Sequence, residues 1–314
     1  MHPGCQVVVT ISSVNLRQDH AVARPQPAAV LELLKPVTWF PPMWAFACGA
    51  VSAGVPFTGR WGDILLGIAI TGPLVCASSQ AVNDWFDREV DALNEPARPI
   101  PSGRIPGTWG LRIAIAWSLL SLAAAIPLGR LGLLAVTIAL AFAWAYSAPP
   151  FRFKQNGWIG NAAVGITYEG LAWVTGAVVL LDGALPHPRV LLVAGLYSLG
   201  AHGIMTLNDY KSIDGDLAMD IRSLPATLGP ELAGLVLCTV MVVPQLVVIT
   251  LLQRWGGPAW APVTIGALVA VQLALMVRFL RAPRARALFL SAIGVPFYVW
   301  GMMVAAVALR GLPT

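Results

Sequence analysis

Residues 232–252 read LAGLVLCTVMVVPQLVVITLL, a run without a single charged side chain. A helix needs about 20 predominantly apolar residues to cross a bilayer, and this run meets that length. Eight further apolar segments of similar length lie at residues 37–57, 63–83, 109–128, 131–148, 158–181, 189–208, 260–280 and 287–309. The pattern predicts an all-α, polytopic membrane bundle of about nine transmembrane helices, because hydrocarbon tolerates no unpaired backbone groups.

The composition indicates the same fold class. Of the 314 residues, 57% are hydrophobic and only 11% are charged, whereas soluble proteins carry about 25% charged residues. The short connections leave no room for a soluble domain, so residues 35–314 are predicted to form one transmembrane domain. Residues 1–34 are expected to be a poorly ordered cytoplasmic tail. The brief apolar run at residues 7–11 has no basic stretch before it, so no cleaved signal peptide is expected.

The net charge of +5 is compatible with nucleic-acid binding, but the distribution of the basic residues argues for membrane topology instead. With the N-terminus in the cytoplasm, fifteen of the 20 Lys and Arg residues fall on the cytoplasmic side. The other side keeps Arg60, Arg130, Arg189, Arg254 and Arg310. This asymmetry follows the positive-inside rule, so we expect no nucleic-acid partner. The four cysteines show no metal-binding spacing and are interpreted as apolar filler.

Acidic residues are rare, yet nine of the fifteen fall in two short stretches that follow the second and sixth apolar segments. The first stretch reads NDWFDREVD over residues 83–91. If the helix continues past residue 83, Asn83, Asp87 and Asp91 recur every four residues on one face, and Asp84 borders that face. This spacing predicts a row of carboxylates at the cytoplasmic end of a membrane helix.

The second stretch reads NDYKSIDGD over residues 208–216, and its Asp209 and Asp216 are seven residues apart, which predicts one helical face. When the two asparagines are superposed, the same residue types recur at offsets zero, one and eight. The aspartate at offset four, Asp87, is matched by Ser212. Two halves built alike predict one shared site.

Carboxylates gathered at a helix end repel one another unless cations lie between them. Magnesium prefers oxygen ligands and is usually held by a few carboxylates together with the phosphates of a substrate. Basic side chains are interleaved with the acids and are suited to gripping phosphate oxygens. They are Lys35, Arg88, Arg98, Arg152, Lys154, Lys211 and Arg222. The combination predicts a magnesium-diphosphate site.

Two other interpretations of the acidic stretches are a solvated surface and a transporter. A single charged stretch is most often a solvated cytoplasmic face, but the repeated motif argues against that interpretation. A transporter with inverted repeats also pairs motifs at helix ends, although it normally places polar groups near the bilayer midplane. Here the carboxylates collect at one interface and the helices are almost bare of charge at mid-depth, with Glu169 as the main exception. This distribution favours an enzyme open to the cytoplasm.

With these motifs the chain resembles the UbiA-type intramembrane prenyltransferases, and within them the chlorophyll and bacteriochlorophyll synthase branch. The resemblance rests on NDWFDREVDALNEP at residues 83–96 with RPIPSG at residues 98–103. The run YSAPP at residues 146–150 and the segment RSLP at residues 222–225 agree with it. The fold that the resemblance implies is a ring of helices around a central cavity, capped by cytoplasmic loops.

The resemblance also implies roles for individual residues. One magnesium would be bound by Asn83, Asp84, Asp87 and Asp91, and a second by Asp209, Asp214 and Asp216. The catalytic carboxylates would be Asp84, Asp87, Asp91, Asp209 and Asp216, and Tyr146 would join the basic residues at the diphosphate. The sequence departs from the family pattern at Ser212, where many relatives carry aspartate, and at Asp220, where many carry glycine.

The reaction implied is esterification, in which the propionate of bacteriochlorophyllide or chlorophyllide attacks geranylgeranyl or phytyl diphosphate and diphosphate leaves. Glu169 is a candidate for the pigment pocket because it is an acid within an apolar segment. His202 is a second candidate, because it lies seven residues before Asp209 on the same helical face and could bind the central magnesium of the pigment. Bacteriochlorophyllide is favoured, and an aromatic or heme acceptor remains the alternative. The implied location is the inner membrane of a photosynthetic bacterium, with membrane lipid around the protein and the site facing the cytoplasm.

Overall fold

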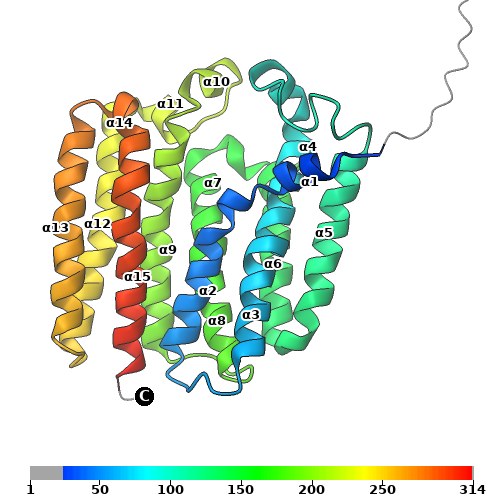
Figure 1. The fold of residues 1–314 in the computed structure, drawn as a ribbon. Helices are drawn as coiled ribbons and strands as arrows, with labels where there is room; N and C mark the ends of the chain where they lie inside the picture. Colours follow the sequence, from blue (N-terminus) through cyan, green and yellow to red (C-terminus); the bar gives the residue numbers. More distant parts are fainter. Residues whose placement is uncertain (1–23, 313–314) are drawn as a thin grey trace, which may run out of the picture.

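The structure is a computed structural model that describes residues 24–312, and no strand occurs in that range. Its rods stand side by side in one bundle (Figure 1). The first half contains α1 (Pro27–Leu34), α2 (Phe40–Ser52), α3 (Trp61–Ala69), α4 (Ala77–Asn94), α5 (Trp109–Ala125), α6 (Gly129–Ser147), α7 (Gly157–Val164) and α8 (Ala172–Leu180). The second half contains α9 (Pro188–Asp209), α10 (Ile213–Ala218), α11 (Leu224–Leu228), α12 (Pro230–Arg254), α13 (Trp260–Leu280), α14 (Pro283–Phe289) and α15 (Val295–Arg310).

Three π-helical segments join shorter helices into continuous rods. They are η2 (Ile70–Cys76) between α3 and α4, η5 (Gly165–Leu171) between α7 and α8, and η6 (Leu290–Gly294) between α14 and α15. Proline contributes to the irregularity of η2, because Pro73 has no backbone N–H to donate. Such bulges re-aim the side chains of a helix and occur frequently at functional sites.

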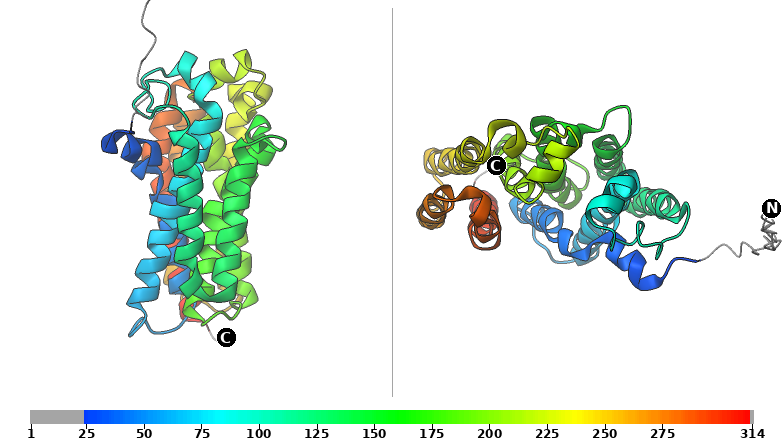
Figure 2. Two further views of the ribbon diagram at one scale, coloured as in Figure 1. Left: turned by 90° about the vertical axis from the view of Figure 1, so that its right-hand side faces the viewer. Right: turned by 90° about the horizontal axis from the view of Figure 1, so that it is seen from above.

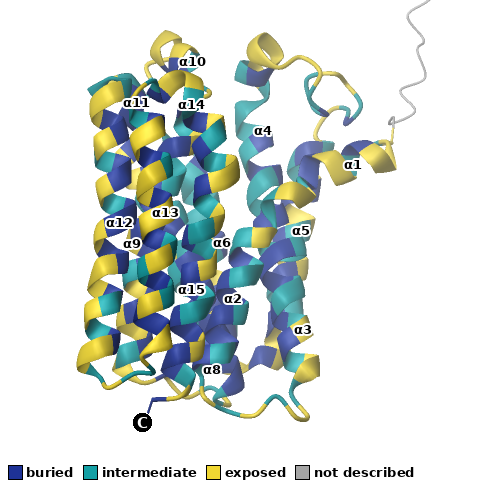
Figure 3. Ribbon diagram, turned by 60° about the vertical axis from the view of Figure 1, so that its left-hand side comes forward, coloured by how far each residue is buried: buried dark blue, intermediate teal, exposed yellow. Residues whose placement is uncertain are grey.

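Seven helical stretches within residues 24–312 are long and apolar enough to cross a membrane, where the sequence predicted about nine. The difference has two sources. The stretch Trp109–Ser147 counts once although it holds both α5 and α6, and α2 has only 13 residues. The outer faces of the bundle carry many exposed residues (Figure 3), among them Leu235, Leu246 and Val263. Lipid is the natural solvent for such faces.

The N-terminal boundary differs from the prediction. Residues 1–23 lie outside the described part of the chain, but α1, which falls within the predicted tail, is an ordered helix. Ala29 and Leu33 on one face of α1 are fully buried, and Glu32 forms an ion pair with Arg104 at 2.5 Å. The four-residue spacing of the two apolar side chains creates the face that packs against the bundle. Residues 27–34, which the sequence assigned to the tail, are therefore helical and packed against the bundle.

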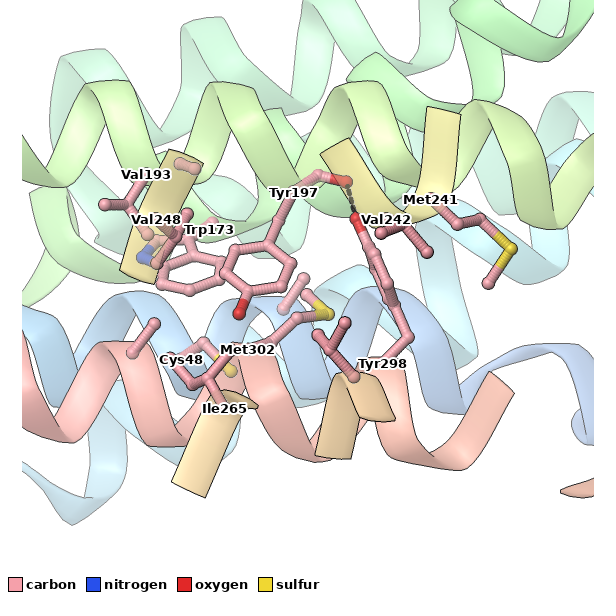
Figure 4. Packing of buried hydrophobic residues seen from close by; sticks show 14 of the residues in the cluster. Cys48, Trp173, Val193, Tyr197, Met241, Val242, Val248, Ile265, Tyr298 and Met302 are labelled. Atoms are coloured by element: carbon pink, nitrogen blue, oxygen red, sulfur yellow. Dashed lines mark hydrogen bonds between the residues drawn. The ribbon is translucent and has the colours of Figure 1, made fainter. Parts of the chain in front are cut away.

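Close helix contacts in the bundle depend on small residues. A Cβ on Gly49 of α2 would lie 1.9 Å from the backbone oxygen of Trp173 in α8. A Cβ on Gly176 of α8 would lie 2.1 Å from the backbone oxygen of Phe46 in α2. Small residues that let backbones approach are typical of membrane helix interfaces. Beside this contact, Trp173 stacks on Tyr197 at 5.7 Å between ring centroids (Figure 4).

Both acidic stretches lie at one end of the bundle. The C-terminal end of α4 and the short helices α10 and α11 occupy the upper end in Figure 1, and the C-terminus lies at the lower end. Seen from above, α12 and α13 lie on the opposite side of the bundle from α5 and α6 (Figure 2). Helix α9 lies between these groups, so the bundle brings the two acidic stretches to the same end from separate rods.

Candidate active site

A central cavity of about 600 Å³ opens between α2, α4, α6, α9 and the π-helical segments. Its lining includes Asn83 from the first acidic stretch and Asn208 and Lys211 from the second. It also includes Val136 and Tyr146 of α6, which are ten residues apart and therefore about 15 Å apart along the helix. The cavity is thus polar where the two stretches meet and runs deep into an apolar interior.

The first acidic stretch lies on an uninterrupted helix, because α4 continues to Asn94. Asn83 donates a hydrogen bond to Ser147 Oγ at 3.3 Å, and Asp87 forms an ion pair with Lys154. The Lys154 side chain is only 10% exposed, and this burial lowers its pKa while the Asp87 charge opposes the shift. Asn83 and Asp87 form the part of the stretch that meets the loop after α6.

Asp84 and Asp91 point to a different set of partners. Lys35 donates to Asp84 Oδ1 at 2.6 Å, and Arg98 donates to Asp91 Oδ2 at 2.8 Å. Arg98 also holds Glu95 at 2.5 Å, which lowers the pKa of that carboxyl. A second cavity of about 410 Å³ is lined by Lys35, Asp84, Glu95 and Arg98 beneath α1. The carboxylates of the first stretch are therefore divided between two faces of α4.

The second acidic stretch does not form the single helix that the seven-residue spacing predicted. Helix α9 ends at Asp209 and α10 begins at Ile213. Ser212 lies in the break, where its hydroxyl contacts the backbone oxygen of Asp209 at 3.1 Å and Oδ2 of Asp216 at 3.0 Å. Serine competes with the helix for backbone hydrogen bonds, which explains the break. The residue that departs from the family pattern thus links the two aspartates.

Tyr146 shows that the two stretches converge. It lines the same cavity as Asn83 of the first stretch and as Asn208 and Lys211 of the second. Asn161 of α7 further fixes Asp209 by donating to its Oδ2 at 3.0 Å. The carboxylates nearest the cavity are therefore held by neutral donors in the second stretch and by a lysine in the first.

The structure does not bring every predicted residue to this site. None of the predicted aspartates belongs to the cavity lining, which the two stretches reach through Asn83, Asn208 and Lys211. Asp214 is also exposed and pairs with Arg284 of α14. Arg88 stacks on the ring of Trp85 at 4.3 Å and donates to the Trp85 carbonyl at 2.8 Å. The local contacts of these two side chains explain why they lie apart from the cavity. Asp220 is exposed with a φ of 53°.

Arg222 and Arg152, two arginines in the loops, differ in their hydrogen bonds. Arg222 is exposed, and its backbone is bonded to the loop after α6. Its N–H donates to the Gln155 carbonyl at 3.0 Å, and its carbonyl accepts from the Gly157 N–H at 2.8 Å. Arg152 has a buried Nε without a hydrogen-bond partner among the described residues. Arg222 thus shapes the loop with its backbone, whereas Arg152 retains a buried donor for a ligand.

Of the two candidates for the pigment pocket, Glu169 and His202, only Glu169 lines the central cavity. Glu169 lines the central cavity from η5. His202 is buried against Trp158, with ring centroids 5.5 Å apart, and does not belong to the cavity lining. The seven-residue spacing between His202 and Asp209 could not predict the contact with Trp158, because that ring belongs to another helix, α7.

A polar cluster in the cavity wall was missed from the sequence. The Tyr168 hydroxyl lies 2.8 Å from Ser79 Oγ, 3.2 Å from Cys76 Sγ and 3.3 Å from Gln80 Nε2. All four side chains line the cavity. The polar run SSQ at residues 78–80, which lies within an apolar segment, could have revealed this cluster.

A magnesium ion needs several oxygen ligands close together. No group of three or more His, Cys, Asp or Glu side chains within residues 24–312 is arranged as a ready metal cluster. Instead, basic or neutral donors hold most of the carboxylates. Asp84 Oδ2 is nevertheless buried without a hydrogen-bond partner, and a carboxylate oxygen is the kind of ligand that magnesium prefers. The residues fit a metal that enters together with its phosphate ligand.

The chain resembles known proteins along most of its length. It is 53% identical over 289 residues to the bacteriochlorophyll synthase 33 kDa chain of Rhodobacter capsulatus, which corresponds to 91% of this chain and 95% of that relative. It is 37% identical over 289 residues to a chloroplastic chlorophyll synthase of Oryza sativa, which corresponds to 88% and 76%.

The fold resembles that of a UbiA homolog from Archaeoglobus fulgidus bound to DMAPP and Mg²⁺. The TM-score is 0.68 at 21% identity, over 89% of this chain and 99% of that chain. Residues 38–301 match the UbiA prenyltransferase family. With its helical bundle, its two acidic stretches at one cavity and these similarities, the chain belongs to the UbiA prenyltransferase family.

Proposed function

We propose that the protein esterifies the propionate of bacteriochlorophyllide with a geranylgeranyl or phytyl group taken from the prenyl diphosphate. The central cavity carries this proposal, because both acidic stretches contribute to its polar end through Asn83 and Asn208. The high identity to bacteriochlorophyll synthase over 91% of the chain supports it. The lower identity to chlorophyll synthase favours bacteriochlorophyllide over chlorophyllide.

The diphosphate is proposed to bind where the two stretches meet. Asn83 and Asp87, with Asp84 and Asp91 behind them, would hold one magnesium, and Asp209 with Asp216 would hold a second. Magnesium, when bound, supplies positive charge that stabilises the leaving diphosphate. A homologous structure that contains both DMAPP and Mg²⁺ supports a metal-dependent donor site.

Basic and polar side chains complete the proposed donor site. Lys154 is paired with Asp87, and a diphosphate would offer its ammonium group a second anionic partner. The unpartnered Nε of Arg152 and the cavity-facing Lys211 can donate to phosphate oxygens. Tyr146 lines the cavity together with Asn83 and Asn208, where its hydroxyl can orient the diphosphate.

The chemical step needs no strong base. A propionate resembles Glu, whose reference pKa is about 4.3, so at neutral pH the carboxylate is already the nucleophile. Its oxygen forms a bond to the first carbon of the prenyl group, while the bond from that carbon to the diphosphate oxygen breaks and the electron pair leaves with diphosphate. The protein's contribution is to orient the reactants and to stabilise the departing charge.

The site is proposed to face the cytoplasm. The basic residues gather at the end of the bundle that carries both acidic stretches, and the positive-inside rule assigns that end to the cytoplasm. The substrates then meet at the inner membrane, where lipid surrounds the bundle and holds the prenyl donor.

Acceptor specificity tests this proposal. Purified protein in detergent is given magnesium, geranylgeranyl diphosphate and one of several acceptors, and products are separated by chromatography with mass detection. The free acid of bacteriochlorophyllide should be converted to the prenyl ester, and its methyl ester should be inert because it has no nucleophilic carboxylate. Neither 4-hydroxybenzoate nor homogentisate should be used. Prenylation of either phenolic acid without any macrocycle ester would contradict the assignment.

A further inference from the structure

One carboxyl lies in the wall of the central cavity, far from the acidic stretches. Glu169 is the single Asp or Glu among the described residues that line this cavity. It is held by the π-helical segment η5 and is only 8% exposed. Irregular helical turns of this kind often mark functional positions, and an acid within a membrane-spanning segment needs a compensating partner.

The polar neighbours of Glu169 have partners, but Glu169 does not. The hydroxyl of Tyr168 contacts Ser79 at 2.8 Å and Gln80 at 3.3 Å, and Thr167 donates to a backbone carbonyl of its own rod at 2.8 Å. No hydrogen bond or ion pair from residues 24–312 reaches the Glu169 carboxyl. The carboxyl therefore lines the cavity without a partner from the protein, and a polar group of a ligand in the cavity can supply one.

The prenyl donor is a poor source for that partner. Its polar atoms all belong to the diphosphate, which the proposed function places beside Asn83. Tyr168, the residue before Glu169 in the chain, contacts Cys76 Sγ through its hydroxyl at 3.2 Å. Cys76 precedes Asn83 by seven residues and is therefore about 10 Å deeper along the rod. Only hydrocarbon of the donor would reach that depth. The macrocyclic acceptor, in contrast, carries oxygen-bearing substituents around its ring.

We propose that Glu169 determines acceptor specificity by donating a hydrogen bond from its carboxyl O–H to a carbonyl oxygen of a substituent on the macrocycle. This inference rests on the proposed function, because it assigns one substrate of that reaction to one wall of the cavity. It places the ring between η5 and the side of the cavity lined by Ser291 and Val295. The donor chain then occupies the part of the cavity lined by α6.

Equilibrium binding tests the proposal without turnover. Full-length protein in detergent, without magnesium or prenyl diphosphate, is titrated with bacteriochlorophyllide while tryptophan fluorescence is followed. Glu169→Leu should weaken binding about tenfold, as expected for the loss of one hydrogen bond. Glu169→Gln, which keeps a donor and an acceptor, should retain most of the affinity. Glu169→Ala repeats the test with no added bulk.

Thr167→Val is the matched control, because Thr167 belongs to the same segment and lines the same cavity, but its hydroxyl already has a partner. It should leave acceptor binding unchanged. In turnover, Glu169→Leu should raise the KM for the acceptor and leave the KM for the prenyl diphosphate unchanged.

The possible failures can be distinguished. If the wild-type protein forms no ester with any chlorin acid, the proposed function is wrong. If the wild-type protein forms the ester, but Glu169→Leu and Glu169→Ala bind the macrocycle as tightly as it does, only the role of Glu169 is overturned. The role of Glu169 would also be overturned if Glu169→Leu raised the KM for the prenyl diphosphate and left the affinity for the macrocycle unchanged.

Discussion

The buried ion pair between Asp87 and Lys154 allows the catalytic and the structural effects of one substitution to be separated. Asp87→Asn removes a proposed metal ligand, and it also leaves the ammonium group of Lys154 without its partner. The two side chains are 19% and 10% exposed, so solvent screens them weakly. Removing one member of a buried pair costs about 3–5 kcal/mol. Burial already lowers the pKa of Lys154, so deprotonation limits the penalty and we expect about 3 kcal/mol.

A double-mutant cycle measures this coupling. The free energy of unfolding is followed by SDS titration in mixed micelles for Asp87→Asn, Lys154→Gln and the double variant. Because the double variant leaves no unpaired charge, it should recover most of the stability that Asp87→Asn loses. Its turnover should nevertheless stay at least about a hundredfold below the wild type, since leaving-group stabilisation is still missing. Full turnover in Asp87→Asn, or no recovery of stability in the double variant, would refute the reasoning.

Three further results are expected. Asp216→Asn should lower turnover about a hundredfold or more in a product assay, whereas Ser212→Asp should be tolerated because that position lies beside Asp216; wild-type turnover in Asp216→Asn would count against the second metal site. Gly49→Leu should abolish recovery of folded protein by size-exclusion chromatography, because even a Cβ there would lie 1.9 Å from a backbone oxygen, whereas Gly266→Leu, with open space around it, should not. A cysteine placed at Pro96 should react only with reagents that reach the cytoplasm; labelling from outside would reverse the topology.

The sequence predicted the membrane fold well, because the length and apolar character of each segment determine whether it can cross a bilayer. It did not predict the π-helical segments, since these depend on packing between rods. The boundary of α1 was also missed. The apolar pair Ala29 and Leu33 is too short a pattern to identify a helix without the surface on which it packs.

The candidate site was predicted only in part. The continuous helix through Asn83 and Asp87 followed from local spacing, whereas the break at Ser212 depends on side-chain bonds to Asp209 and Asp216. The contact of Asp84 with Lys35 depends on where α1 packs, and no local sequence pattern determines that position. Long-range placement therefore decides which acidic residues share a cavity.

The most direct test of the central claim is the stoichiometry of diphosphate release. Inorganic diphosphate and macrocycle ester are quantified in the same reaction, with bacteriochlorophyllide free acid, geranylgeranyl diphosphate and magnesium present. A prenyltransferase of the proposed kind should release one diphosphate for each ester formed, and should release none when the acceptor or magnesium is omitted. Diphosphate release that does not depend on the acceptor, or transport of the substrate without any release, would contradict the account.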